Sequence, residues 1–176
     1  MVAWSPPEPP LVAGELIVRA VRDDDEEFVR RIWSDPLSVA MMLRRQPSDV
    51  ELAGIWHYVR DGAFKRRFAY LVVDIDGVSV ANITVSGTRP RVAEIGYVVD
   101  VDARGRGIAS RAVDAVSRWA FGRLDVSRLE ARTYLDNPAS HKVAERAGFT
   151  AEGIERRSVY VLGGPQDCIV WVRFPE

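Results

Sequence analysis

The sequence has few of the residues that build metal sites and disulfides. Its 176 residues include one cysteine, Cys168, and two histidines, His57 and His141. A single cysteine excludes an internal disulfide and a CxxC zinc site, and two histidines are too few for a histidine-rich metal site. We therefore expect a protein without a structural metal.

An excess of one charge and long apolar runs are missing as well. Lys and Arg number 24 against 25 Asp and Glu, so the chain lacks the basic surplus that is typical of nucleic-acid-binding proteins. No run approaches the roughly 18 apolar residues of a membrane span. The opening MVAWSPPEPP has neither the basic nor the apolar part of an export signal. We expect a cytoplasmic protein that binds neither nucleic acid nor a membrane.

What is present is typical of one globular domain. Hydrophobic residues make up 47% of the chain, too many for a disordered protein, and the length suits one domain of roughly 150 residues with a small extension. Four of the ten prolines lie within residues 1–14. Because proline fixes φ and removes an N–H donor, we expect an extended tail over 1–14, either loosely held or docked through Trp4, before a single domain over 15–176.

Hydrophobic periodicity predicts alternating strands and helices. Ser48 and Glu51 form a capping box, and the Asp76-Gly77 step suits a hairpin turn. Pro138 suits the first turn of a helix, and Gly148 suits its end. The expected strands are 15–21, 68–73, 78–86, 94–101, 128–133, 149–159 and 167–174, and the expected helices are 24–34, 48–60, 107–123 and one that begins near 137. This order predicts a mixed α/β sheet.

One segment, VVDVDARGRGIASR at 98–111, joins a buried strand to an amphipathic helix through a glycine-rich turn. Such a turn and the following helix N-terminus leave several N–H groups unpaired, which makes an anion site. Gly105 and Gly107 let the backbone approach phosphates closely because no Cβ intrudes. Cationic partners would come from Arg104, Arg106 and Arg111.

Three phosphate-binding patterns compete for this turn. A nucleotide P-loop requires GxxxxGK[ST], and its lysine is missing. A dinucleotide-binding GxGxxG belongs in the first strand–helix turn, whereas here Ser110 replaces the last glycine and the segment lies past mid-chain. The pattern R-x-x-G-x-A at 104–109 resembles the acetyl-CoA pyrophosphate loop of the GNAT superfamily of N-acetyltransferases. A glycine-rich turn without a ligand remains an alternative.

The resemblance extends over residues 15–174, in the same order of elements. It is closest to the RimJ/RimL-like branch, which acetylates the N-termini of ribosomal proteins. The matching motifs are AEIGYVV at 93–99, LEAR at 129–132, DNPAS at 136–140, HKVAERAGF at 141–149 and EG at 152–153. The resemblance implies an α/β (α+β) GNAT fold. Its mixed sheet of about seven strands would splay at the cofactor site, with four or five flanking helices.

The resemblance also implies acetyl-CoA as cofactor and assigns residues to it. Backbone groups of Tyr97, Val98 and Val99 would pair with pantetheine, as an added strand does. Asn137 and Ser140 would meet the thiol end, and Lys142 would reach a phosphate. Each of these residues has an alternative explanation. Asn137 could only cap the helix, Ser140 could only form a hydrogen bond in its first turn, and Lys142 could be solvated. The pyrophosphate would lie on the loop residues Arg104, Gly105, Arg106, Gly107, Ile108, Ala109 and Ser110.

The implied reaction is direct attack of a primary amine on the thioester. Because amines are protonated at neutral pH, a base is needed. Glu94 is the first candidate and Glu130 the second, although an ion pair with an arginine explains either. Ser140 would donate to the departing thiolate, and the N–H of Val98 or Val99 would hold the oxyanion. Cys168 has no evident base partner, so we expect it to be structural rather than a nucleophile.

The acceptor would be a protein N-terminus or a small molecule, bound by a monomer or a homodimer. Apolar candidates for its pocket are Trp33, Met41, Met42 and Trp56, each of which could instead belong to the core. The basic run 65–67 could attract an acidic acceptor or be an exposed loop. Tyr160 could line the pocket, and Val159 stands where ribosomal-protein acetyltransferases can carry a carboxylate.

A second function class stays open on the sequence alone. The chain could be a catalytically silent GNAT-like module that binds CoA or a protein partner without turnover. Amine-dependent release of free thiol from acetyl-CoA distinguishes the enzyme from the module.

Overall fold

The computed structural model describes residues 4–42, 45–62, 67–161 and 164–176, without the side chains of residues 41, 42, 160 and 161. It confirms the α/β class. The strands are β1 (Leu11–Ala13), β2 (Leu16–Ala20), β3 (Phe68–Ile75), β4 (Val78–Arg89), β5 (Val92–Val99), β6 (Arg128–Tyr134), β7 (Thr150–Val161) and β8 (Gly164–Arg173). The helices are α1 (Glu26–Ser34), α2 (Pro36–Met42), α3 (Asp49–Gly62), α4 (Ile108–Arg123) and α5 (Pro138–Arg146), with short 3-10 turns at Asp23–Asp25 and Val101–Ala103.

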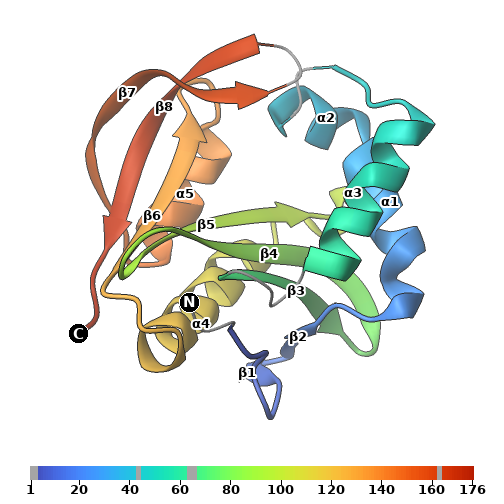
Figure 1. The fold of residues 1–176 in the computed structure, drawn as a ribbon, viewed down its shortest axis with the longest axis horizontal. Coiled ribbons are helices and arrows are strands. Elements are labelled where there is room, and N and C mark those ends of the chain that lie inside the picture. The colour runs from blue at the N-terminus through green and yellow to red at the C-terminus, as the bar shows by residue number, and fades with distance from the viewer. Residues whose placement is uncertain (1–3, 43–44, 63–66, 162–163) are drawn as a thin grey trace.

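The strands form one mixed sheet in the order β1-β2-β3-β4-β5-β6-β8-β7. Every neighbouring pair is antiparallel except β5 and β6, which run parallel. This parallel pair is joined through α4, since a parallel connection needs a crossover. Figure 1 shows β6, β8 and β7 turning away from the plane of β3, β4 and β5.

Local sequence signals set most of the boundaries. The Ser48 amide donates to the Glu51 carboxylate at 2.8 Å and the Glu51 amide donates to the Ser48 hydroxyl at 3.3 Å, which confirms the capping box before α3. Asp76 and Gly77 both have positive φ, 50° and 78°, as a tight hairpin turn between β3 and β4 requires. Two short elements, α2 and β1, have no periodic pattern long enough to predict them.

The proline-rich N-terminal segment is docked through Trp4, one of the two alternatives expected for it, whereas the short strand β1 within it was not expected. Trp4 is only 8% exposed and belongs to the main core. The guanidinium of Arg67 lies 5.4 Å from the centre of its ring. Residues 11–13 pair with β2, with Leu11 opposite Val18. The start of the domain at residue 15 stays a prediction.

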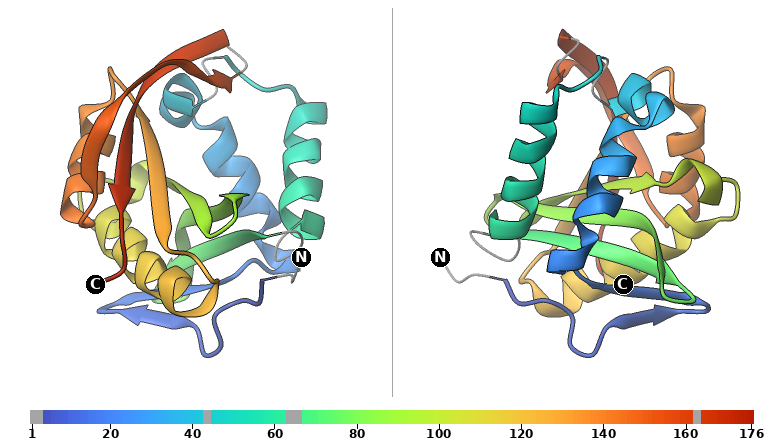
Figure 2. Two further views of the ribbon diagram at one scale, coloured as in Figure 1. Left: turned by 60° about the vertical axis from the view of Figure 1, so that its left-hand side comes forward. Right: turned by 90° about the vertical axis from the view of Figure 1, so that its right-hand side faces the viewer.

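Two apolar clusters cover the two faces of the sheet. The larger one packs α4 and part of α5 against the strands, through residues such as Ile108, Val116 and Ile83. The smaller one packs α1 and α3 against Tyr70, Val72 and Val98. Figure 2 shows α1 and α3 standing together, away from α4. Side chains that alternate along β5 therefore face either α4 or the α1–α3 pair.

None of the helices within the described ranges combines the length and the apolar character that a membrane crossing requires. A groove lies between the N-terminal segment and the turn that joins β4 to β5, lined by Trp4, Pro7, Arg89 and Arg123 among others. It lies at the end of β5 opposite to the glycine-rich turn.

A buried ion-pair network anchors α1 to the sheet. Arg19 on β2 donates to both carboxylate oxygens of Asp25 at 2.8 Å and to Asp74 on β3 at 2.6 Å. All three residues are at most 7% exposed. Burial acts to raise the pKa of the Asp25 carboxyl. The hydrogen bonds from Arg19 and from the Arg22 amide, together with the charges of these two arginines, outweigh burial, and the pKa is lowered. Asp25 directly precedes α1, so this network sets where the helix begins.

Replacing Arg19 by Ala should destabilise the protein by about 3–5 kcal/mol, because two buried carboxylates lose their cation. The matched control is Arg30→Ala, which removes an exposed pair with Glu26 one turn away and should cost less than about 1 kcal/mol. Urea unfolding of both variants measures the difference. Equal, small losses would show that the network does not support the fold.

Candidate active site

The sheet opens between β5 and β6. Their pairing covers Val92 with Arg128, Ala93 with Leu129 and Glu94 with Glu130. Beyond Glu94, β5 continues to Val99 and β6 to Tyr134, but the two strands are no longer paired within the described part of the chain. β6 stays paired with β8 up to Tyr134, so it follows β8 away from β5. The result is a V-shaped gap that begins at Glu94 and Glu130.

The register of β5 decides which of its backbone groups face this gap. The Asp100 amide donates to Val80 on β4 at 2.9 Å, and the register between β4 and β5 is regular from Val99 to Ala93. By alternation, the N–H and C=O groups of Val98 point to β4, whereas those of Ile95, Tyr97 and Val99 point to the gap. The expectation that Val98 offers its backbone to pantetheine or to the oxyanion is therefore wrong.

The glycine-rich turn follows at the open end of the gap. Among the described residues, no carbonyl or side chain accepts a hydrogen bond from the backbone N–H groups of residues 105–110. The first amide of α4 with an intrahelical partner is that of Arg111, which donates to Gly107. Six consecutive donors, aided by the positive end of the helix dipole, suit an anion such as a diphosphate.

Backbone conformation explains the two glycines of the turn. Gly105 has φ of 77° and Gly107 has φ of 70°, values that side chains disfavour. Arg106 between them is exposed and has no partner among the residues that the structure describes. It remains the predicted cation of the turn.

Arg104 and Arg111 have other partners than a phosphate. Arg104 donates to the Val99 carbonyl at 3.0 Å and to Asp35 and Ser38, at 3.0 and 2.8 Å. Its amide is also used, at 3.5 Å from the Val101 carbonyl. Arg111 pairs with Glu15 at 3.0 Å. The Arg104 side chain thus ties the end of β5 to the junction of α1 and α2, and contact of this residue with the cofactor stays a prediction.

The start of α5 brings Ser140 to the gap side of β5. The Asn137 side chain accepts from the Ser140 amide at 3.1 Å, so Asn137 is the N-cap of α5. The Ser140 hydroxyl lies 2.7 Å from the Tyr97 hydroxyl, which also donates to the Ser140 carbonyl at 3.0 Å. Burial raises the pKa of Tyr97 to about 12, so its proton stays in place at neutral pH. Lys142 is exposed on the same helix.

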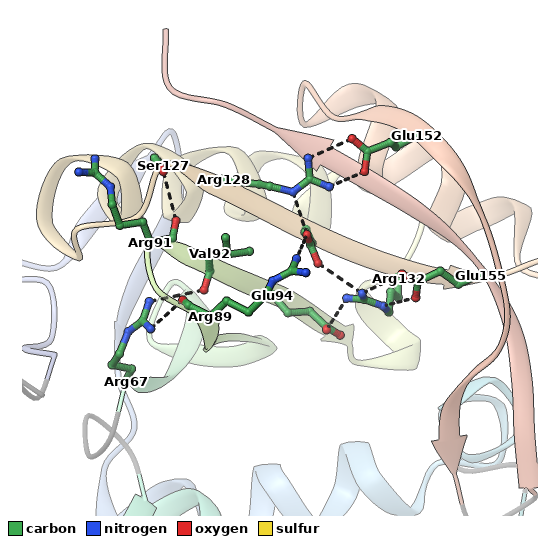
Figure 3. A network of polar contacts seen from close by, with 11 residues as sticks. Arg67, Arg89, Arg91, Val92, Glu94, Ser127, Arg128, Arg132, Glu152 and Glu155 are labelled. Carbon is green, nitrogen blue, oxygen red and sulfur yellow. Dashed lines mark hydrogen bonds and ion pairs between the residues drawn. The ribbon is translucent and has the colours of Figure 1, made fainter.

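Glu130 is enclosed by arginines. Its carboxylate accepts from Arg89 at 2.7 Å, from Arg128 at 2.8 Å and from Arg132 at 3.3 Å, and its side chain is only 3% exposed. Arg128 also pairs with Glu152 (Figure 3). A carboxylate that is 3% exposed and held by three arginines is not accessible to a substrate amine. The geometry therefore favours the ion-pair interpretation of Glu130 over its role as a base.

Glu94 differs from Glu130 in its exposure and in the number of arginines that contact it. It accepts one hydrogen bond, from Arg132 at 2.7 Å, and its side chain remains 37% exposed. Burial is the main cause that raises the pKa of its carboxyl above the ordinary value, and the neighbouring charges of Glu130 and Glu155 add to it. Figure 3 shows Glu94 at the edge of the network. Of the two predicted bases, Glu94 is the one that a substrate amine can reach.

The other residues that the sequence suggested for the site either belong to the core or lie outside the described residues. Trp56 is 6% exposed in the smaller core cluster, and Trp33 packs partly buried against it. Cys168 is fully buried, and burial raises the pKa of its thiol. The side chains of Met41, Met42 and Tyr160, and residues 65 and 66, lie outside the described residues.

Three functional features escaped the sequence analysis. Tyr97 was expected to act only through its backbone, yet its hydroxyl reaches Ser140. Arg132 and Glu155, 3.0 Å apart, were not singled out. Strand alternation places Arg132 on the same face as Glu130 and could have indicated it, whereas Glu155 reaches Arg132 only because β7 folds back beside β8.

Within the described ranges, no three His, Cys, Asp or Glu side chains are arranged to hold a metal ion. The groups that the site does present are backbone donors, the Tyr97 and Ser140 hydroxyls and the Glu94 carboxylate.

Comparison with known proteins agrees with this geometry. A family model described as an acetyltransferase (GNAT) domain matches residues 15–150. The L-amino acid N-acetyltransferase AaaT of Escherichia coli (strain K12) is 30% identical over 149 residues, which covers 82% of this chain and 88% of AaaT. Two N-acetyltransferases of Bacillus subtilis (strain 168) match over 81 and 77 residues only, so the chain spans 46% and 42% of their length.

Solved structures share the fold. A GNAT-family acetyltransferase from Bacillus anthracis has a TM-score of 0.80 at 19% identity, covering 94% of this chain and 98% of that one. Mycobacterium smegmatis RimJ, solved with CoA-disulfide, has a TM-score of 0.73 at 24% identity, covering 98% and 87%. The expected resemblance to the RimJ/RimL-like branch is thus confirmed at the level of fold.

The family match over residues 15–150 confirms the family that the sequence motifs predicted. The V-shaped gap and the amides of the turn lie where that resemblance implies pantetheine and the diphosphate of CoA. The chain belongs to the GNAT family of N-acetyltransferases.

Proposed function

We propose that this protein transfers an acetyl group from acetyl-CoA to a primary amine by direct attack. The observation that carries the proposal is the run of N–H donors at residues 105–110, placed where the gap between β5 and β6 ends. Acetyl-CoA supplies the activated thioester. The chain supplies a strand edge, an anion-binding turn, a hydroxyl pair and a carboxylate along one path.

The strand edge holds and orients the linear part of the cofactor. Ile95, Tyr97 and Val99 direct backbone groups into the gap, although the Val99 carbonyl is already bound by Arg104. The Val99 amide is left as the predicted oxyanion donor. Lys142 and Arg106, both exposed, remain the predicted cations for phosphate groups.

Proton transfer is divided between two groups. The acceptor ammonium gives one proton to Glu94, whose pKa is raised above its ordinary value by burial, which makes its carboxylate a stronger base. The nitrogen then forms a bond to the acetyl carbon as the carbon–sulfur bond breaks. The nitrogen loses its second proton in this step, and the departing sulfur takes up one proton to become the thiol of CoA. The Tyr97 proton can turn from the Ser140 carbonyl to the Ser140 hydroxyl oxygen, since both lie within hydrogen-bond distance. In that arrangement Ser140 is free to donate its own proton at the departing sulfur.

The acceptor is proposed to be a protein N-terminus or a small-molecule amine. Relatives support both classes, since AaaT is named for L-amino acids and another relative from Escherichia coli is named a ribosomal-protein-serine acetyltransferase. A cytoplasmic location, a monomeric or homodimeric state and the lack of nucleic-acid or membrane partners stay predictions. Amine-dependent release of free thiol from acetyl-CoA tests the proposal, and cofactor binding without any such release would favour the silent module.

Gly107→Asp should weaken CoA binding at least about tenfold, because it brings a negative charge to the diphosphate site. Gly107→Asn is the matched control. It has nearly the same size and the same backbone demand at φ of 70° but no charge, so its loss should be several-fold smaller. Calorimetric titration with CoA measures both. Equal CoA affinities of the Asp and Asn variants would show that the diphosphate does not bind at this turn.

Ser140→Ala should lower kcat by about tenfold or more while changing the dissociation constant of CoA by less than about threefold. Asn137 remains to cap α5, so the helix should persist. Tyr97→Phe tests the second hydroxyl and should cause a smaller loss, since Ser140 stays. An unchanged kcat in Ser140→Ala would show that Ser140 has only a structural role in the first turn of α5.

The pH profile of kcat at saturating substrates should fall on the acid side through the raised pKa of Glu94, because only the ionised carboxylate accepts a proton. Glu94→Gln should remove this limb and lower kcat by about 10² or more. Glu152→Gln is the control: this carboxylate belongs to the same network, but the hydrogen bond from Arg128 lowers its pKa. An acid limb that survives in Glu94→Gln would assign the base elsewhere.

A further inference from the structure

The sheet face that packs against α1 and α3 changes from apolar to polar between neighbouring strands. On β3 this face is apolar, with Tyr70 and Val72 in the smaller core cluster. None of the described residues of β4 belongs to that cluster, because strand alternation places Asn82, Thr84 and Ser86 on this face. β4 lies between two paired strands, and polar side chains on a covered face of such a strand need hydrogen-bond partners.

The hydroxyl of Thr84 has no such partner. Within the described ranges, neither a side chain nor a carbonyl forms a hydrogen bond with it, although the residue is half-buried. The side-chain oxygen of Asn82 is unsatisfied as well, but Asn82 is only 1% exposed and lies opposite Val98. Thr84 lies opposite Gly96, nearer to the start of the V-shaped gap. Its hydroxyl is therefore placed to bind a molecule that enters there.

Gly96 keeps the place in front of this hydroxyl open. Its φ lies outside the left-handed region, so its backbone conformation does not require glycine, and glycine weakens the interior of a strand. Among the described residues, the only atom within 4 Å of the position that a Cβ would take is Thr84 Oγ1, at 2.9 Å. A side chain at residue 96 would displace this hydroxyl. Opposite Ser86, in contrast, the same place is occupied by the side chain of Glu94.

The open place lies beside the proposed base. Glu94 is two residues before Gly96 on the same face of β5, at about 7 Å along the strand. Pairing with β6 ends at Glu94, so Gly96 borders the V-shaped gap. Pantetheine is expected to pair with the gap-facing backbone groups of Ile95 and Tyr97, which lie in the plane of the sheet. The face above Gly96 is thereby left to the acceptor.

We propose that Thr84 and Gly96 form the binding position of the acceptor nitrogen, next to Glu94. One N–H of the ammonium faces the Glu94 carboxylate, which takes up its proton, and a second N–H donates to the Thr84 hydroxyl oxygen. The two hydrogen bonds fix the direction of the lone pair that the proton transfer frees on the nitrogen. Gly96 supplies the space. This inference rests on the proposed acetyl transfer and assigns two further residues to that same site.

Thr84→Val tests the hydroxyl, because valine keeps the branched shape without it. The probes are L-phenylalanine, L-phenylalanine amide and 2-phenylethylamine, which share one aromatic group. For each amine that is acetylated, kcat/KM should fall at least about tenfold, and by the same factor within about threefold, since the hydroxyl contacts only the nitrogen. The dissociation constant of CoA should stay within about twofold, which also shows that the variant is folded. Thr84→Ser keeps the hydroxyl and should retain at least about a third of the activity.

Gly96→Ala tests the space and should lower kcat/KM by about 10². Gly153→Ala is the matched control, since this glycine of β7 has nothing within 4 Å of its Cβ position. Ser86→Ala is the control for the hydroxyl, and both controls should change kcat/KM less than about threefold. The acid limb of the pH profile should persist in Thr84→Val, because Glu94 is intact.

Three results would overturn the inference and leave the acetyl transfer standing. They are an unchanged kcat/KM in Thr84→Val or Gly96→Ala, a loss that is confined to one amine, and an equal loss in Ser86→Ala. No acetylation of any amine by the unmodified protein would instead overturn the proposed function, and the inference with it.

Discussion

The structure depends on the parting of two parallel strands. A sheet normally satisfies its backbone groups by pairing, and an unpaired group away from water costs free energy. Here β5 and β6 pair over three positions and then separate. The gap leaves a row of backbone groups on β5, continued by the amides of the turn at 105–110, in need of a partner. A linear molecule with amides at one end and a diphosphate at the other supplies what the sheet lacks.

Side-chain chemistry is concentrated at the two ends of this opening. At the wide end, glycines expose amides and Arg106 remains unpaired. At the narrow end, the arginines are shared unevenly among the glutamates. Glu130 has three partners and is sealed, whereas Glu94 has one and stays accessible. Two carboxylates on adjacent strands, opposite each other in register, thus acquire different properties from their surroundings alone.

Much of this was predictable, because the signals are local. A strand, a glycine-rich turn and an amphipathic helix in succession predict an anion site, and Ser48, Asp76 and Pro138 mark their elements by turn and cap preferences. Short elements without periodicity, such as α2 and β1, could not be predicted. For the proline-rich segment two alternatives stayed open, because proline content indicates an extended backbone but does not decide whether Trp4 is buried in the core.

The sequence by itself determined the class of fold, the anion-binding turn and the family, since each follows from residues that lie close together in the chain. Only the tertiary structure decided the partners of Arg104 and Arg132, the direction of the Val98 backbone groups and the contact of Tyr97 with Ser140. The physical reason is the distance along the chain over which each effect acts. Propensities and caps act within a few residues, whereas ion pairs and strand register join residues tens of positions apart and exist only after the chain has folded.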